Sequence, residues 1–254
     1  MNRLIVGGIP TVSATRAELA QCMVSDWRQT ACGKLPLPRI VTSSNGSVIY
    51  AFNKNSDFRA LMLQADIIDA DGMALVIASR VLCRQPLIER CATTDFIEDA
   101  SATAAAAGMK FYFLGSEAGR AAAAAQALRQ RYPGLQIAGT HDGYFRREDE
   151  TVICEEILRQ RTDVLWVGLG SPLQEQFAVR NQQRLAGVTW IRTCGGLFDH
   201  LTGRTRRAPR WIQTAGLEWA MRALQEPRRL GPRYLKTNPV ALYYLLTRTH
   251  DQHG

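Results

Sequence analysis

Acidic residues that could activate a substrate follow an apolar segment in the first third of this 254-residue chain. Asp71 and Gly72 follow the run Ile67–Ala70, which also contains Asp69. An Asp-Gly pair after a strand exposes a carboxylate at the entrance to the next helix, where it faces the ligand cleft of an α/β sheet. Such a carboxylate could act as a general base that takes a proton from a hydroxyl group.

The same acidic residues allow a second interpretation. Two carboxylates two residues apart share one face of a strand, so Asp69 and Asp71 could together hold a divalent metal ion on a sugar nucleotide. The turn at Gly72 could instead leave only Asp71 pointing into the cleft. We favour Asp71 as a lone base and expect chemistry that is independent of a metal cofactor.

Small residues follow four other predicted strands. They are Gly115-Ser116, Thr140–Gly143, Gly168–Ser171 and Gly195-Gly196. Backbone N–H groups at such strand ends, before a helix N-terminus, suit phosphate binding, although each glycine could serve only a tight turn. The fingerprints GxGxxG and GxxxxGK[ST] are absent, which disfavours NAD and a P-loop nucleotide site.

Three further polar residues have a functional or a structural interpretation. Gln174 and Glu175 fall in the first turn of a predicted helix, where Gln174 could bind a ligand and Glu175 could simply complement the helix dipole. Arg90 could contact substrate or form an ion pair with Glu89 or Asp95.

Positive charge gathers in the last fifth of the chain. Nine Lys and Arg residues and two acidic residues lie between 201 and 236, and the whole chain has a net charge of +8. Such a stretch meets an anionic partner: phosphate, diphosphate, nucleic acid or an anionic membrane. We expect one helix to begin after Pro209, to carry Trp211 to Leu224, and to end at Pro227.

Aromatic and aliphatic residues alternate with the basic residues between 228 and 246. This mixture is typical of a helix that lies in a membrane interface, although a docking helix with snorkelling basic side chains gives a similar pattern.

Strands and helices alternate regularly from 110 to 193, which predicts a parallel sheet covered on both faces. The expected fold class is α/β, a doubly wound and mostly parallel sheet with a basic, helical C-terminal appendage. We divide the chain into a core at 1–203 and an appendage at 204–254. Met73–Leu82 is apolar on every side, which predicts a buried helix. The six cysteines lack metal-site spacing and are interpreted as reduced thiols.

Taken together, these segments resemble the WecG/TagA/CpsF family of bacterial glycosyltransferases, glycosyltransferase family 26. The resemblance covers roughly residues 40 to 235 in collinear order. Its matching segments are Asn45, Asp71-Gly72, Pro86–Arg90, Tyr112–Gly115, Tyr132–Gly134, Gly139–Phe145, Val167–Glu175, Gly195–Asp199, Gly203, Arg207–Trp211, Leu217–Trp219, Arg222, Glu226-Pro227 and Arg229.

The resemblance implies inverting transfer of a sugar from a UDP-sugar to an undecaprenyl-diphosphate-linked saccharide, in the synthesis of exopolysaccharide, teichoic acid or common antigen. Asp71 falls on the family's catalytic base, and Arg90 and Gln174 on its active-site Arg and Gln. Ser43 stands where the family has Thr. The expected substrate-binding residues are Thr42, Asn45, Gly115, Ser116, Asp142, Gly168, Gly170, Ser171, Gly195, Gly196, Asp199, Arg207, Arg210, Arg222 and Arg229.

The sugar stays open among N-acetylmannosamine, its uronic acid and glucose. The resemblance further implies a cytoplasmic protein, peripheral on the inner face of the cell membrane, which it contacts through the appendage. We expect no nucleic-acid partner and leave a homo-oligomer open. Two rival interpretations are a nucleotide-sugar-binding regulator without catalysis and a basic nucleic-acid-binding protein.

Overall fold

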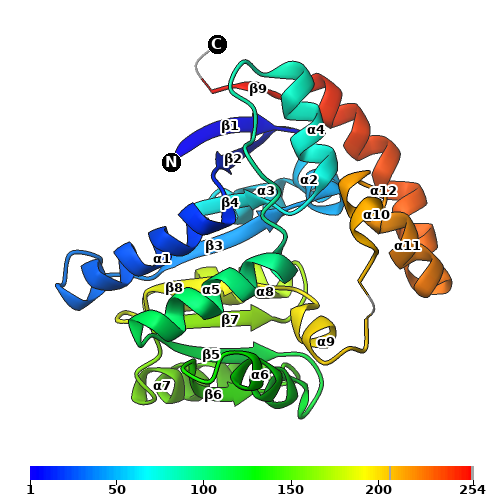
Figure 1. Ribbon diagram of the computed structural model, residues 1–254. Helices are drawn as coiled ribbons and strands as arrows, with labels where there is room; N and C mark the ends of the chain where they lie inside the picture. Colours follow the sequence, from blue (N-terminus) through cyan, green and yellow to red (C-terminus); the bar gives the residue numbers. More distant parts are fainter. Residues whose placement is uncertain (206, 253–254) are drawn as a thin grey trace.

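A six-stranded sheet forms the centre of the protein (Figure 1). The computed structural model describes residues 1–205 and 207–252, without the side chains of Arg210 and Arg229. The strand order is β4-β3-β8-β7-β5-β6, and all neighbouring strands are parallel. The strands are β3 (Arg39–Ser44), β4 (Ile67–Ala70), β5 (Lys110–Gly115), β6 (Gln136–His141), β7 (Val164–Gly168) and β8 (Trp190–Thr193). The predicted doubly wound α/β fold is confirmed.

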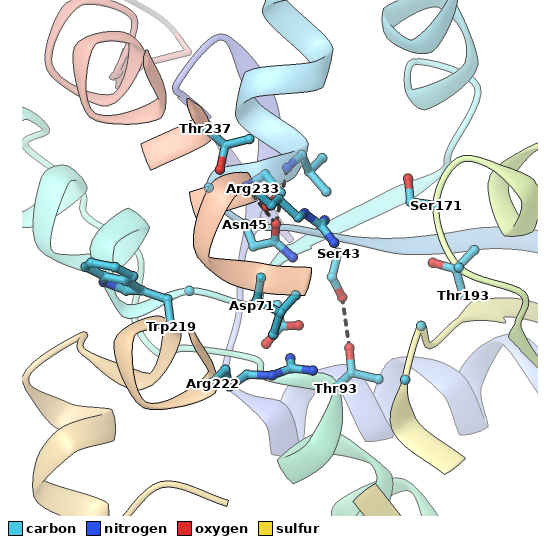
Figure 2. Close-up of a pocket in the computed structure, with 18 of the residues that line it drawn as sticks. Ser43, Asn45, Asp71, Thr93, Ser171, Thr193, Trp219, Arg222, Arg233 and Thr237 are labelled. Atoms are coloured by element: carbon cyan, nitrogen blue, oxygen red, sulfur yellow. Dashed lines mark hydrogen bonds between the residues drawn. The ribbon is translucent and has the colours of Figure 1, made fainter. Parts of the chain in front are cut away.

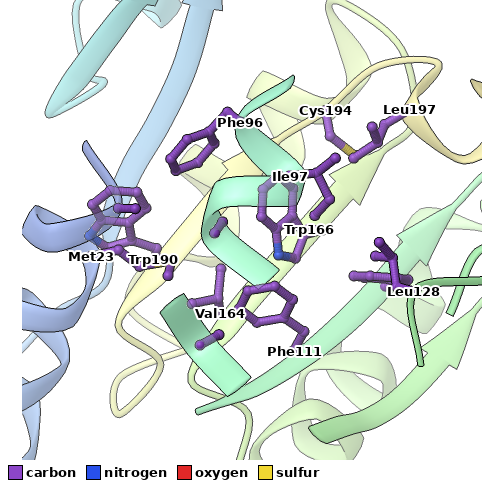
Figure 3. Packing of buried hydrophobic residues seen from close by; sticks show 14 of the residues in the cluster. Met23, Phe96, Ile97, Phe111, Leu128, Val164, Trp166, Trp190, Cys194 and Leu197 are labelled. Atoms are coloured by element: carbon purple, nitrogen blue, oxygen red, sulfur yellow. The ribbon is translucent and has the colours of Figure 1, made fainter. Parts of the chain in front are cut away.

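Helices cover both faces of this sheet because its strands are apolar on both sides. Phe111 and Phe113 of β5 point to one face, where they join a core cluster with α1, α5, α6 and α9 (Figure 3). Tyr112 and Leu114 point to the other face, toward α7 and α8. The helices are α1 (Arg16–Ala31), α5 (Thr93–Ala107), α6 (Arg120–Arg131), α7 (Glu150–Arg159, after the short η1, Arg147–Asp149), α8 (Leu173–Asn181) and α9 (Leu197–Leu201).

A second, antiparallel sheet joins the two ends of the chain (Figure 1). Its order is β2-β1-β9, with β1 at Asn2–Val6, β2 at Ile9–Ser13 and β9 at His250–Asp251. Gly7 and Gly8 connect β1 and β2 with positive φ angles of 58° and 88°, the conformation that a two-residue hairpin requires. The sequence analysis did not predict β2 or β9.

The basic C-terminal stretch forms three helices: α10 (Arg210–Thr214), α11 (Glu218–Gln225) and α12 (Pro227–Thr247). The single helix predicted from Pro209 to Pro227 is therefore wrong. Gly216 interrupts it with a φ of +75°, a left-handed conformation that glycine adopts without strain. Helix α12 packs against α2 (Gly46–Lys54), which precedes α3 (Ser56–Met62), and α11 packs against α12. The division into a core at 1–203 and an appendage at 204–254 stays a prediction.

Helix α4 (Met73–Leu82) is only partly buried, which corrects the prediction of a buried helix. Leu75 and Val76 are buried, whereas Ile77 is 44% and Val81 75% exposed. Within the described residues, no helix combines the length and the apolar character that crossing a membrane requires.

Candidate functional site

A cleft of about 2980 Å³ opens at the carboxyl ends of β3, β4, β7 and β8. This is the edge at which open α/β sheets bind ligands. Where the strand order reverses, the loops that follow two neighbouring strands run to opposite faces of the sheet and leave a crevice between them. Helices α11 and α12 form the opposite wall. We call Ser43, Asp71, Thr93 and Gln174, which the central sheet and its helices contribute, the floor. We call α11 and α12 the cover.

Asp71 is the carboxylate of the floor (Figure 2). It directly follows β4, and its backbone N–H donates to the Ser44 carbonyl over 2.8 Å, which fixes the turn toward the cleft. Burial raises the pKa of the Asp71 carboxyl to about 7, and the charge of Asp69 acts in the same direction. Arg90 and Arg192 oppose this rise. A group with this pKa can accept a proton near neutral pH.

Ser43 and Thr93 stand beside Asp71, with their hydroxyl oxygens 3.2 Å apart (Figure 2). Beneath them, the fully buried Arg192 donates to the Ser43 hydroxyl over 2.9 Å. A second nitrogen of Arg192 lies 2.6 Å from Asp69. Asp69 is therefore paired inside the sheet and does not line the cleft, whereas Asp71 does.

Gln174 connects α8 to the turn after β8. Its side-chain oxygen accepts from the Gly195 backbone N–H over 2.9 Å, and its amide nitrogen donates to Glu175 over 2.8 Å. Both Gln174 and Glu175 are buried, and burial raises the pKa of the Glu175 carboxyl. The pair holds the glycine turn in place at the cleft wall.

Among the side chains that the structure describes, Arg222 of α11 and Arg233 of α12 are the basic residues of the cover that line the cleft. Both are exposed, both line the cleft, and neither side chain forms a hydrogen bond or ion pair with the residues that the structure describes. Figure 2 shows both guanidinium groups directed into the cleft, on opposite sides of Asp71 in this view. Unpaired guanidinium groups in a cleft suit the oxygens of a phosphate or diphosphate.

Arg90 connects helix α11 of the cover to the rest of the protein. One of its nitrogens donates to Glu218 of α11 over 2.7 Å, and another donates to Asp95 over 3.0 Å and Gln213 over 2.9 Å. Arg207 also pairs with Asp95. The ion pair between Arg90 and Asp95, which the sequence left open, is present.

Comparison with known proteins agrees with this geometry. The model of the glycosyl transferase WecG/TagA/CpsF family matches residues 5–253. The chain belongs to this family. It is 33% identical over 204 residues, 80% of this chain and 78% of the relative, to an N-acetylglucosaminyldiphosphoundecaprenol N-acetyl-beta-D-mannosaminyltransferase of Staphylococcus aureus strain MW2. The same figures hold for the protein of that name in S. aureus strain NCTC 8325.

Most of the predicted site residues of this glycosyltransferase line one cleft. They are Ser43, Asn45, Asp71, Arg90, Ser116, Gly168, Gly170, Ser171, Gln174, Gly195, Gly196, Asp199, Arg207 and Arg222. Asn45 also caps α2, because its side-chain oxygen accepts from the N–H groups of Ser47 and Val48. Asp199 pairs with Arg120 of α6 over 3.3 Å. The side chains of Arg210 and Arg229 lie outside the described part of the structure.

Three predicted substrate-binding residues do not line the cleft, although each is followed by a residue that does. Thr42 is buried and accepts a hydrogen bond from Thr193 over 2.8 Å. Gly115 lets β5 approach β7, since a Cβ there would lie 2.4 Å from the Gly168 carbonyl oxygen. Asp142 accepts from the Tyr144 backbone N–H over 3.2 Å and so shapes the loop whose next residues do line the cleft.

The sequence analysis missed several residues of this glycosyltransferase site. Thr93, Glu218 and Arg233 line the cleft, and Arg192 supports it from below. Arg233 belonged to the predicted basic stretch, but no spacing rule selects it, because a helix break separates it from Arg222. Among the residues that the structure describes, no three His, Cys, Asp or Glu side chains are grouped to hold a metal ion.

Proposed function

We propose that this glycosyltransferase transfers N-acetylmannosamine from a UDP-sugar to an undecaprenyl-diphosphate-linked saccharide, with inversion at the anomeric carbon. The names of the S. aureus relatives support both the sugar and the acceptor. The observation that carries the proposal is the arrangement of Asp71, with a pKa of about 7, in one cleft with Arg222 and Arg233, which have no partner among the described side chains.

The floor and the cover of the cleft have different roles in this reaction. Asp71 takes the proton from the acceptor hydroxyl as its oxygen attacks the anomeric carbon from the face opposite UDP. Attack from that face inverts the configuration, and UDP leaves as the new bond forms. Arg222 and Arg233 stabilise the negative charge that develops on the departing diphosphate. The cleft has room for both substrates, since pockets for single small ligands measure roughly 300–1,000 Å³.

The proposed reaction is independent of a metal ion. The pairing of Asp69 with Arg192 supports this part of the proposal, because it occupies the carboxylate that a metal would share with Asp71. The guanidinium groups of the cover supply positive charge at the diphosphate in its place.

The proposed cellular setting is the inner face of the cell membrane, where the lipid-linked acceptor would be met. Large apolar side chains are exposed along the C-terminal helices, among them Trp211 (70%), Leu224 (81%) and Leu235 (80%). Arg228 lies between Leu224 and Leu235 in the sequence, and Lys236 follows Leu235. Apolar and basic side chains together favour an anionic membrane interface.

The experiment that tests the proposal measures transfer from UDP-N-acetylmannosamine, its uronic acid and UDP-glucose to a short-chain polyprenyl-diphosphate N-acetylglucosamine. Each donor is tested with and without EDTA. We expect transfer from UDP-N-acetylmannosamine, unchanged by EDTA, to give a product of inverted configuration. Loss of transfer in EDTA would assign a metal to the site, and UDP binding without transfer from any donor would favour a non-catalytic regulator.

A further inference from the structure

Arg192 is one of the largest fully buried side chains of the protein and lies directly beneath the floor. One of its nitrogens, Nη1, lies 2.6 Å from Asp69. The other, Nη2, donates to the hydroxyl groups of Ser43 over 2.9 Å and Thr93 over 3.3 Å. The guanidinium carbon lies 5.4 Å from the centre of the Phe96 ring. Arg192 itself does not line the cleft, so it can act on a substrate only through its neighbours.

These contacts connect three adjacent strands of the sheet, β8, β3 and β4. Arg192 on β8 stands beside Val41 on β3, and Ser43 on β3 stands beside Asp69 on β4. Asp71 lies two residues beyond Asp69, where β4 has ended. Arg192 thus contacts Ser43 and Thr93 directly, and it is connected to Asp71 through Asp69.

Stability alone does not account for this buried pair. Removing two charges from water is costly, and replacing a buried ion pair by apolar residues of similar size is often neutral or stabilises by roughly 1–4 kcal/mol. Removing a single partner is destabilising because it leaves an unpaired charge in the core. The location of the pair under the floor suggests that it serves the reaction.

We propose that Arg192 is a positioning residue for transfer: it fixes the hydroxyl groups of Ser43 and Thr93 at the floor and, with Asp69, sets the electrostatic environment of the Asp71 carboxylate. This inference rests on the proposed function, since it takes Asp71 as the base. The charged groups around Asp71 are Asp69, Arg90, Arg192, Glu218, Arg222 and Arg233.

The first test separates positioning from folding with a paired replacement, Asp69→Val with Arg192→Met. We expect this variant to fold as stably as the wild type, because no unpaired charge is left in the core. We also expect kcat to fall by about tenfold to a hundredfold, more than KM for the donor changes, because small displacements of reacting groups are costly. A folded variant with the kcat of the wild type would overturn the proposal.

The matched control is Arg180→Met on α8. Arg180 pairs with the buried Glu150 and does not line the cleft. This variant should lose stability and keep both kcat and the pH profile of the folded fraction. This control measures how the loss of an arginine from an ion pair affects stability and activity when that arginine does not contact the floor.

The second test is the pH profile of kcat/KM in Asp69→Asn, which stands even if the paired variant fails to fold. Asparagine keeps an oxygen for Arg192 but removes the negative charge. Because the charge of Asp69 raises the pKa of Asp71, its loss lowers that pKa, and Asp71 stays ionised to lower pH. The acidic limb of the profile should therefore move to lower pH. A limb that does not move would contradict the role of Asp69 and Arg192.

Asp71→Asn shows which of the two proposals has failed. If transfer survives in Asp71→Asn, the proposed base is wrong and the positioning proposal falls with it. If Asp71→Asn abolishes transfer while the Asp69 and Arg192 variants leave kcat and the acidic limb unchanged, Asp71 is the base and the positioning proposal alone is wrong.

Discussion

The floor and the cover of the cleft are built in opposite ways. On the floor, Ser43, Thr93 and Gln174 each make hydrogen bonds to other residues, and the buried Arg192 supports Ser43 and Thr93 from below. On the cover, Arg222 and Arg233 are exposed and have no partner among the described side chains. The floor is held in place by contacts within the protein, whereas the arginines of the cover are available to bind a ligand.

This difference matches what each side is proposed to do. Proton transfer depends on the position of a single carboxylate, so fixed neighbours favour it. Holding a diphosphate depends on positive charge that several long side chains can deliver. Substitutions on the floor should therefore change the rate of the chemical step, and substitutions on the cover should change substrate binding.

The largest effect is expected from Asp71→Asn. Removing a general base typically slows a reaction by about 10²–10⁴-fold, and we expect a fall in kcat of this size. Affinity for UDP, measured by calorimetry, should change little, because the proposed binding groups for the diphosphate lie on the cover. If donor affinity fell as much as kcat, the separation between floor and cover would be wrong.

The same substitution should also stabilise the fold. The Asp71 pKa of about 7 lies above its ordinary value of 3.8, so the folded state binds this proton more tightly than the unfolded chain does. Stability therefore falls as the pH rises from 3.8 to about 7, and it stays reduced at higher pH, where Asp71 is ionised in the folded protein. At pH 8, Asp71→Asn should melt at a higher temperature than the wild type. An equal or lower Tm would show that ionising Asp71 does not destabilise the folded protein.

The next largest effect is expected on the cover, in Arg222→Met and Arg233→Met. Each substitution removes charged hydrogen-bond donors to the diphosphate, worth about 1.5–3 kcal/mol, so KM for the donor should rise roughly tenfold or more. The increase should shrink at high salt, which screens exposed charges. Arg228→Met is the control, because Arg228 is exposed on α12 but does not line the cleft.

A smaller effect is expected where the floor and the cover meet, in Glu218→Gln. The substitution weakens the contact of Arg90 with α11, which is 2.7 Å long in the structure. We expect kcat/KM to fall by about threefold to tenfold, as for the loss of one charged hydrogen bond at a partly exposed position. Faster amide exchange in α11 should accompany the fall, and Glu155→Gln on α7 should change neither quantity.

The smallest effect on the chemistry is expected from Trp211→Ser with Leu224→Ser. Both side chains are exposed on the C-terminal helices and outside the cleft. Binding to anionic vesicles should weaken roughly tenfold or more, as expected for the loss of buried apolar surface. Transfer to a water-soluble acceptor should not change. Val152→Ser, an exposed apolar position on α7, controls for general effects on the surface.

The sequence predicted the floor better than the cover because the floor depends on local features. Asp71 and Gln174 stand at a strand end and a helix start, which short patterns reveal, and the parallel sheet follows from alternating elements. Arg192 was missed because its partner Asp69 lies two strands away, a relation that only the strand order creates. The exposed face of α4 was missed because an apolar sequence does not tell which side a neighbouring element covers.

The C-terminal helices were predicted least well. Pro227 marks the start of α12 as its chemistry suggests, but the break at Gly216 needed the left-handed φ that the structure shows. The hairpin strand β2 was not predicted because it contains Pro10. Strand β9 was not predicted because it has only two residues.

The central claim is that the ionised Asp71 carboxylate removes the proton of the acceptor. The pH dependence of kcat/KM in the wild type and in Asp71→Asn tests it most directly. Since burial raises the pKa of Asp71 to about 7, we predict that activity of the wild type falls as the pH drops through 7, and that the residual activity of Asp71→Asn lacks this limb. A wild-type profile that is flat from about pH 6 to 8, or a limb that persists in Asp71→Asn, would show that another group is the base.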